Sequence, residues 1–167
     1  MIQTRLQEGF CIDTCALIDL GRVHYPPDVF PGVWADIESL VSRGLLIAPK
    51  EVFDELKGVD DEILKWARRF KEMFKESDED QLQEVADILA RFPGLIDPTK
   101  TKPEADPFLI ALAKSSGWTV VTSERPRTSP NARPKIPDVC KSYGIRCISL
   151  VEFFRERGWK YTRVGVP

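Results

Sequence analysis

Short apolar runs that alternate with longer amphipathic stretches constrain the fold of this chain more than any other feature. Each run is only four or five residues long, which is typical of a buried strand, and the longer stretches repeat apolar residues at the helical steps of three and four. The runs lie at residues 10–13, 45–48, 118–122 and 145–148. Because strands separated by helices pair in parallel through right-handed crossovers, we predict an α/β fold. It is a three-layer α/β/α sandwich around a doubly wound, Rossmann-like parallel sheet.

The amphipathic stretches predict helices between these strands. Thr14 is a plausible N-cap for the first helix. A helical hairpin is predicted as an insertion around residues 60–92, with Ser77 capping its second helix. No internal repeat or linker interrupts the chain, so we expect one domain over residues 1–167. The other helices are predicted at residues 14–21, 28–44, 49–57, 105–117, 138–143 and directly after Ser149.

Composition and charge exclude several protein classes. Apolar residues make up 43% of the chain and charged residues 30%. No stretch approaches the roughly 20 apolar residues of a membrane span, and the first ten residues lack the apolar core of a signal peptide. We therefore expect a cytoplasmic protein without membrane contact. The net charge is −2, so any contact with nucleic acid must use a local basic patch.

The four cysteines, at positions 11, 15, 140 and 147, lie inside apolar runs. In a cytoplasmic chain this placement favours small buried thiols over disulfides. A zinc site built from the C-x3-C and C-x6-C pairs is the alternative, although structural zinc ligands are usually more closely spaced.

One carboxylate, Asp13, ends the first apolar run, and three further acids occupy comparable places. Glu55 lies on the helix after the second run, Asp106 begins an apolar helix, and Glu124 comes just after the third run. Doubly wound sheets place their sites in the crevice at the carboxyl ends of the strands. We therefore predict that these four acids gather at one edge of the sheet.

Each acid except Asp13 also has a simple structural explanation. Asp106 before Pro107 suits an N-cap with proline at the first helical position, Glu55 suits an exposed helix surface, and Glu124 suits a polar loop. Asp13 differs because a carboxylate at the end of a buried strand is costly to desolvate without a partner.

A divalent metal is the natural companion of such an acidic edge. Four carboxylates brought together would repel one another and could not all remain ionised without cations. Mg²⁺ or Mn²⁺ takes oxygen ligands and keeps waters for chemistry. Such a metal binds a phosphodiester oxygen and lowers the pKa of bound water for in-line attack. This chemistry needs no histidine, which fits a chain whose single histidine is His24.

At these positions the sequence resembles the PIN-domain nucleases. Their first strand ends in hydrophobic-Asp-Thr/Ser-x-x-Leu-Ile, which residues 12–18 match, and their second acid is a helical Glu followed by Leu, which E55-L56 matches. Their third acid heads a helix of small residues, as Asp106 does, and their fourth follows a strand in a Thr-x-Asp element. Here that element is T122-S123-E124, with Glu in place of the usual Asp. The resemblance covers roughly residues 9 to 155 in the family's order.

This resemblance implies a divalent-metal-dependent endoribonuclease, similar to the toxins of bacterial and archaeal toxin-antitoxin pairs. RNA would be the substrate, an antitoxin protein a partner, and a homodimer the common assembly. Asp13, Glu55, Asp106 and Glu124 would be metal ligands and catalytic residues. We expect Thr14, Thr122 and Ser123 either to cap local backbone or to hydrogen-bond an acid or a metal-bound water.

A basic loop follows the fourth acid. We expect its cations to contact phosphates that flank the cleaved bond, and the alternative is an ordinary solvated loop. The aromatic tail around Trp159 is expected to pack against the body of the protein rather than to stack on RNA bases. The cations of the loop are Arg125, Arg127, Arg133 and Lys135.

Two other functions stay open. The first is a catalytically degenerate PIN-like module that binds nucleic acid or protein. The second is another doubly wound phosphoryl enzyme, such as a haloacid-dehalogenase-like phosphatase or a receiver domain, which is disfavoured because D13-T14-C15 lacks the second Asp of a D-x-D motif. A nucleotide kinase or GTPase is disfavoured because the chain contains no G-x-x-x-x-G-K-[ST].

Overall fold

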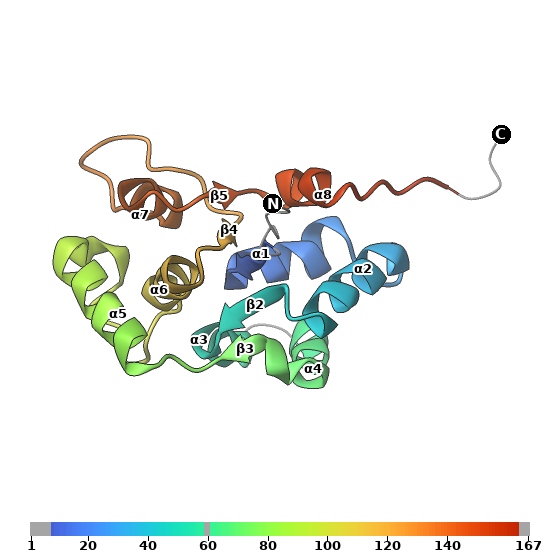
Figure 1. Ribbon diagram of the computed structural model, residues 1–167, viewed down its shortest axis with the longest axis horizontal. Coiled ribbons are helices and arrows are strands. Elements are labelled where there is room, and N and C mark those ends of the chain that lie inside the picture. The colour runs from blue at the N-terminus through green and yellow to red at the C-terminus, as the bar shows by residue number, and fades with distance from the viewer. Residues whose placement is uncertain (1–7, 59–60, 164–167) are drawn as a thin grey trace, which may run out of the picture.

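Five parallel strands form one sheet in the order β3-β2-β1-β4-β5 (Figure 1). The computed structural model describes residues 8–58 and 61–163. The chain starts at the centre of the sheet, moves outward through β2 to β3, and then crosses back to add β4 and β5 on the other side of β1. The predicted doubly wound α/β fold is confirmed. The strands are β1 (Phe10–Ile12), β2 (Leu46–Pro49), β3 (Phe74–Lys75), β4 (Thr119–Val121) and β5 (Cys147–Ile148).

The sheet is buried on both faces because successive strand residues point to opposite sides. In β1, Phe10 and Ile12 belong to one core cluster and Cys11 belongs to the other. In β4, Val121 and Val120 divide in the same way. This alternation within continuous apolar runs is what the three-layer prediction requires.

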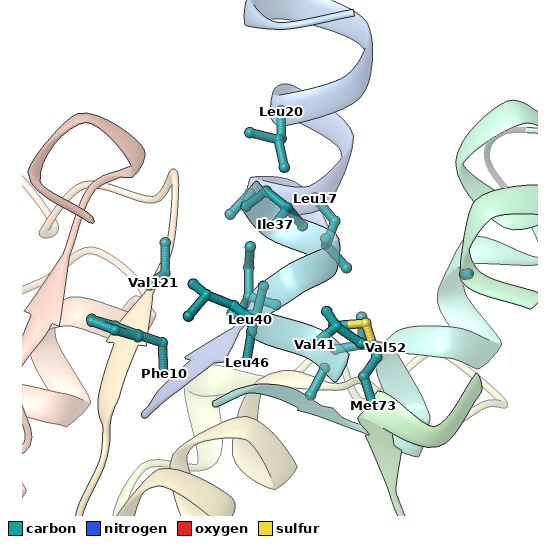
Figure 2. Close-up of a cluster of buried hydrophobic side chains, with 14 of the residues drawn as sticks. Phe10, Leu17, Leu20, Ile37, Leu40, Val41, Leu46, Val52, Met73 and Val121 are labelled. Carbon is teal, nitrogen blue, oxygen red and sulfur yellow. The ribbon is translucent and has the colours of Figure 1, made fainter. Parts of the chain in front are cut away.

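The first face of the sheet is covered by the helices that follow β1 and β2, together with the last helix of the chain. Figure 2 shows how Phe10 and Leu46 from the strands meet Ile37 and Leu40 in this core. The elements on this face are α1 (Thr14–Ile18), the π-helix η1 (Asp19–His24), α2 (Pro31–Ser42), α3 (Lys50–Leu56), α4 (Asp61–Arg69), the 3-10 turn η2 (Lys71–Met73) and α8 (Leu150–Arg157).

The second face is covered by α5 (Glu79–Arg91), α6 (Asp106–Ser116) and α7 (Ile136–Tyr143), with the 3-10 turn η3 (Pro93–Leu95) between α5 and α6. Helix α6 contacts β1, β2 and β4 and carries α5 on its other side (Figure 1). Its residues are apolar nearly all round because it is enclosed between the sheet and a second helix. It ends at Gly117, whose left-handed φ of 70° suits a glycine cap.

The predicted helical hairpin around residues 60–92 is wrong in its described part, although both helices exist; residues 59–60 lie outside the described residues. Between α4 and α5 the chain forms β3, which pairs with β2 through Ala48 and Phe74. Helix α4 packs Trp66 into the first face and α5 packs Ile88 into the second. The segment is therefore a crossover connection. A two-residue strand carries no periodic signal, which is why the pattern did not predict it.

Two further predictions concern the ends of elements. Asp78, not Ser77, caps α5, and it forms a capping box with Gln81. The tail packs as predicted, since the ring of Trp159 lies 5.3 Å from that of Phe153 between centroids. Within the described residues, no helix has both the length and the apolar character needed to cross a membrane.

The cysteines are free thiols, as predicted. Cys11 and Cys140 are buried, whereas Cys15 and Cys147 are partly exposed. Among the residues that the structure describes, no group of three or more histidine, cysteine or acidic side chains is arranged to hold a metal ion directly. The alternative of a preformed zinc site therefore gains no support.

Candidate active site

The four predicted acids come together at the carboxyl edge of the sheet, where the strand order reverses between β1 and β4. Asp13 follows β1 and Glu124 follows β4, while Asp106 opens α6, which leads back into β4. Glu55 lies in α3, directly after β2. Burial raises the pKa of the Asp106 carboxyl group, and the negative charges of Glu124, Asp13 and Glu55 raise it further. Reversal points of this kind are where ligands bind in open α/β sheets.

Asp13 is held in one orientation by hydrogen bonds to both of its carboxylate oxygens. Its Oδ1 accepts from the backbone N–H of Ala16 at 2.6 Å, so Asp13 is the N-cap of α1. Its Oδ2 accepts from the hydroxyl of Thr122 and from the thiol of Cys15, the latter at 3.2 Å. Burial nevertheless raises its pKa to about 6, with a smaller contribution from the charge of Glu124. The prediction that Thr14 caps this helix is wrong.

Thr122 couples Asp13 to Glu124 in a short chain of hydrogen bonds. The backbone N–H of Glu124 donates to the Thr122 hydroxyl at 3.0 Å, and that hydroxyl in turn donates to Asp13. One oxygen of Glu124, Oε2, accepts from the N–H of Ile136 at 2.9 Å. The loop after β4 is thereby fixed to both β1 and the start of α7. Thr122 thus hydrogen-bonds an acid, as one of the two interpretations of the sequence predicts.

Glu55 bridges two elements rather than pointing to solvent. Its Oε1 accepts from the backbone N–H of Ala105 at 2.8 Å, and its Oε2 accepts from the hydroxyl of Thr14. Helix α3 thus ties the start of α1 to the start of α6. Both carboxylate oxygens of Glu55 are hydrogen-bonded to other elements, so the alternative of a plain surface residue is wrong.

Asp106 is the acid with the least support from the protein. It is the first residue of α6, whose N-cap is Ala105, so the interpretation of Asp106 as an N-cap is wrong. Its carboxylate forms no hydrogen bond to any described residue, although it is only partly exposed. Burial, followed by the charges of Glu124, Asp13 and Glu55, raises its pKa to about 7. A carboxyl group in such surroundings is stabilised by taking up either a proton or a cation.

The donor set fits a hard divalent cation. All four side chains supply oxygen, which Mg²⁺ and Mn²⁺ prefer. Three of them place negative charge near the Asp106 carboxylate, which has no hydrogen-bond donor in the part of the chain that the structure describes. A carboxylate oxygen that accepts one hydrogen bond keeps a further lone pair, so the bonds to Asp13 and Glu124 leave room for coordination. Among the described residues, the acids are not arranged as a preformed metal site. Cation binding would therefore need side-chain adjustment.

Two of the four cations in the predicted basic loop form hydrogen bonds to backbone carbonyls. The guanidinium of Arg127 donates to the carbonyls of Pro130 and Ala132, and that of Arg133 donates to the carbonyl of Gly94 at 3.0 Å. Lys135 is exposed just before α7. Arg125 is exposed and is the one cation of this loop that lines a cavity together with Glu124 among the described residues. The hydroxyl of Ser123 forms no hydrogen bond to a described residue.

Sequence reasoning missed two groups at this edge. The thiol of Cys15 donates to Asp13, which only the neighbouring D-T-C spacing could have suggested. The loop before α6 brings Lys100 and Lys102 beside Glu55 and Asp106, where they line a second cavity. These lysines carry no periodic or motif signal, because their place depends on where the α5–α6 connection lies in space.

Comparisons with solved structures return, among others, two proteins of very low sequence identity to this chain. The crystal structure of FitAcB from Neisseria gonorrhoeae is 15% identical and covers 83% of this chain and 96% of its own, with a TM-score of 0.49. The crystal structure of PAE2754 from Pyrobaculum aerophilum is 14% identical and covers 90% of this chain and 97% of its own, with a TM-score of 0.47. We draw no argument about activity from likenesses this distant. None of the curated proteins matches the sequence.

A protein-family model matches nearly the whole chain. The match extends over residues 10–161, from the start of β1 to the aromatic tail that packs on α8, and includes all four acids. The chain therefore belongs to the family described as Domain of unknown function (DUF4411).

Proposed function

We propose that this protein is a PIN-like, divalent-metal-dependent endoribonuclease. The observation that carries the proposal is the meeting of Asp13, Glu55, Asp106 and Glu124 at the reversal point of the sheet, where three like charges act on an Asp106 that accepts no hydrogen bond from a described residue. Such an arrangement is unfavourable while all four acids are ionised, and a bound cation would relieve the repulsion. The resemblance of the motifs to PIN-domain nucleases supports the same reaction class.

The residues divide the work between them. Asp13, Asp106 and Glu124 would hold the ion, since Asp106 accepts no hydrogen bond from a described residue and Asp13 and Glu124 each keep an oxygen with a free lone pair. Thr122 fixes the orientation of Asp13, and Glu55 holds Asp106 in place through the N–H of Ala105. This differs from the expectation that all four acids are ligands. When bound, Mg²⁺ or Mn²⁺ supplies Lewis acidity, which lowers the pKa of water and stabilises charge on phosphoryl oxygens.

The direct test is a titration of Mg²⁺ and Mn²⁺ into wild type and Asp13→Asn, with RNA cleavage and thermal unfolding followed together. We expect both metals to stabilise the wild type and one or both to support cleavage of a mixed RNA pool, and we expect Asp13→Asn to lose both effects. Asp54→Asn is the matched control, because Asp54 lies on α3 next to Glu55 but is exposed and paired with Lys57. Wild type that neither binds metal nor cleaves RNA would refute the proposal.

One observation favours a second candidate, a catalytically degenerate PIN-like binding module. Protein donors already occupy oxygens of Asp13, Glu55 and Glu124, so these acids also stabilise the fold without a metal. This candidate predicts affinity for RNA or protein that a chelator does not change. The titration above separates the two.

A biological role as the toxin of a toxin-antitoxin pair extends the proposal. It rests on the resemblance of the sequence motifs, which also supports an antitoxin partner, a homodimer and a cytoplasmic location. Co-expression with the product of the adjacent reading frame, followed by purification and a test of growth inhibition, would decide it. Expression of the chain alone should arrest growth, and Asp13→Asn should not.

A further inference from the structure

Two cavities with different linings border the acidic edge. The first, of about 670 Å³, is lined by Thr14, Glu55 and Asp106 and by the loop before α6, which we name the lysine loop (residues 99–104). The second, of about 540 Å³, is lined by Thr122, Glu124 and segments beyond them, and we name it the ring pocket. Because each cavity includes residues of the site, a chain that crosses the acids must enter both.

The lysine loop offers polar groups suited to a phosphate backbone. Thr99, Thr101 and Lys102 are exposed and line the cavity. Lys100 pairs with Glu104 at 2.7 Å, whereas Lys102 has no ion pair with a described residue. No aromatic side chain lines this cavity among the described residues, so it offers no platform on which a base could stack. The chemistry here favours contacts to phosphates and hydroxyls, which carry no sequence information.

The ring pocket has a different lining. His24 and Tyr25 contribute two rings whose centroids are 6.1 Å apart, and Tyr25 is supported from behind by Phe154 at 5.0 Å. Arg125 lines the pocket next to Glu124 and has no ion pair with a described residue. Asp19 also lines the pocket. The carboxylate of Asp19 can accept a hydrogen bond from the amino group of a base.

We propose that a single strand of RNA crosses the acidic edge with one base in the ring pocket and only its backbone on the lysine loop. Arg125 contacts the phosphate at the mouth of the ring pocket, and Lys102 contacts a phosphate on the far side of the acids. The consequence is a base preference on one side of the cleaved bond and none on the other. This inference rests on the proposed nuclease function and adds the substrate's path to it.

The experiment uses a single-stranded RNA pool with a randomised centre, incubated with the full chain and Mn²⁺, and the cleaved ends are sequenced. We expect a base bias at positions on one side of the bond only. Asp19→Asn should reduce that bias roughly five-fold, because its carboxylate accepts a hydrogen bond only from a base that carries an amino group. His24→Ala should instead weaken binding of the strand, because an aromatic ring stacks on any base. Lys102→Ala should leave the bias unchanged and lower the slope of log affinity against log salt by about 1. Lys141→Ala, an exposed lysine on α7, is the matched control.

The outcomes separate the path from the reaction. Equal bias on both sides, no bias, or a Lys102→Ala variant that binds like Lys141→Ala would overturn the path even when cleavage occurs. If the wild type cleaves nothing, binding of labelled single-stranded RNA by the same variants still tests the path. Binding that depends on Lys102 and His24 would then keep the path while the proposed function fails. Equal affinity for an RNA duplex or for single-stranded DNA of the same sequence would contradict the single-stranded RNA substrate.

Discussion

Asp13 and Asp106 are acids that the fold places where their charged forms are unfavourable. Burial is the main cause in both, and it raises their pKa values from 3.8 to about 6 and about 7. At a pH between the ordinary pKa and these raised values, Asp13 and Asp106 are protonated in the folded protein and ionised in the unfolded chain. The free energy of unfolding of the metal-free protein therefore falls as the pH rises from about 4 to about 7.

Asp13→Asn should consequently make the metal-free protein more stable at pH 8, by about 1 to 3 kcal/mol. Asparagine keeps the N-cap of α1, and the benefit should shrink towards pH 4, where Asp13 is protonated. Urea unfolding in the presence of a chelator, at pH 4.5 and pH 8, measures the difference. The exposed Asp54→Asn serves as control and should change stability by less than about 0.5 kcal/mol. A loss of stability at pH 8 in Asp13→Asn would show that its hydrogen bonds outweigh its burial.

Glu55 provides a second prediction, because its two oxygens bridge Ala105 and Thr14. Glu55→Gln keeps an oxygen for the Ala105 N–H and an amide group for Thr14, whereas Glu55→Ala removes both partners. We expect Glu55→Gln to retain metal-induced stabilisation close to that of the wild type and Glu55→Ala to lose about 1 to 3 kcal/mol of stability together with metal binding. If Glu55→Gln loses metal binding as fully as Asp106→Asn, Glu55 is a ligand and not a positioning residue.

The sequence predicted which acids meet but not how each is held. The strand order and the rule that sites lie at carboxyl ends place Asp13, Glu55, Asp106 and Glu124 at one edge. The bridge through Glu55 and the approach of Lys102 depend on the path of the α5–α6 connection, and no local pattern encodes that path. Asp13 is both the N-cap of α1 and one of the four acids at the edge, whereas the sequence analysis assigned the cap to its neighbour Thr14.

Among the helices and strands, apolar periodicity predicted the longer elements and failed on the shortest. Helix α6 and strand β4 lie within a residue or two of their predicted ends. Strand β3 has two residues, and its pairing with β2 converts the predicted hairpin into a crossover. Such an edge strand is defined by its hydrogen bonds to a neighbour, which a single sequence does not reveal.

The start of β1 depends on a close approach that sequence reasoning did not single out. Gly9 precedes β1 and is buried, and a Cβ there would lie 2.4 Å from two atoms of the Trp118 ring. An indole ring is rigid, so Gly9→Ala must displace either β1 or the strand that Trp118 precedes. We expect a loss of about 1 to 3 kcal/mol, measured by thermal or urea unfolding. Gly44→Ala is a useful contrast, since a Cβ there meets nothing within 4 Å and the cost comes only from a left-handed φ of 69°. Equal losses in the two variants would contradict the steric explanation.

For the whole molecule, the acidic edge gives two opposite responses to pH. Metal binding strengthens as the pH rises, whereas the stability of the metal-free protein falls. Protons and cations compete for the carboxylates of Asp13 and Asp106, whose pKa values are about 6 and about 7. Metal binding should therefore be weak at pH 5 and strengthen as both groups lose their protons. Over the same range the metal-free protein loses stability.

We accordingly expect saturating Mn²⁺ to turn a stability that falls between pH 5 and pH 8 into one that stays level or rises. At one hundred times the dissociation constant, the ion contributes about 2.7 kcal/mol at pH 8. The measurement is a set of unfolding curves at pH 5, 6, 7 and 8 with Mn²⁺ or with a chelator. In Asp106→Asn the two sets should nearly coincide, because the variant lacks both the uncompensated charge and a principal ligand. A Mn²⁺ effect of equal size at pH 5 and pH 8, or one that survives in Asp106→Asn, would place the binding of metal elsewhere on the protein.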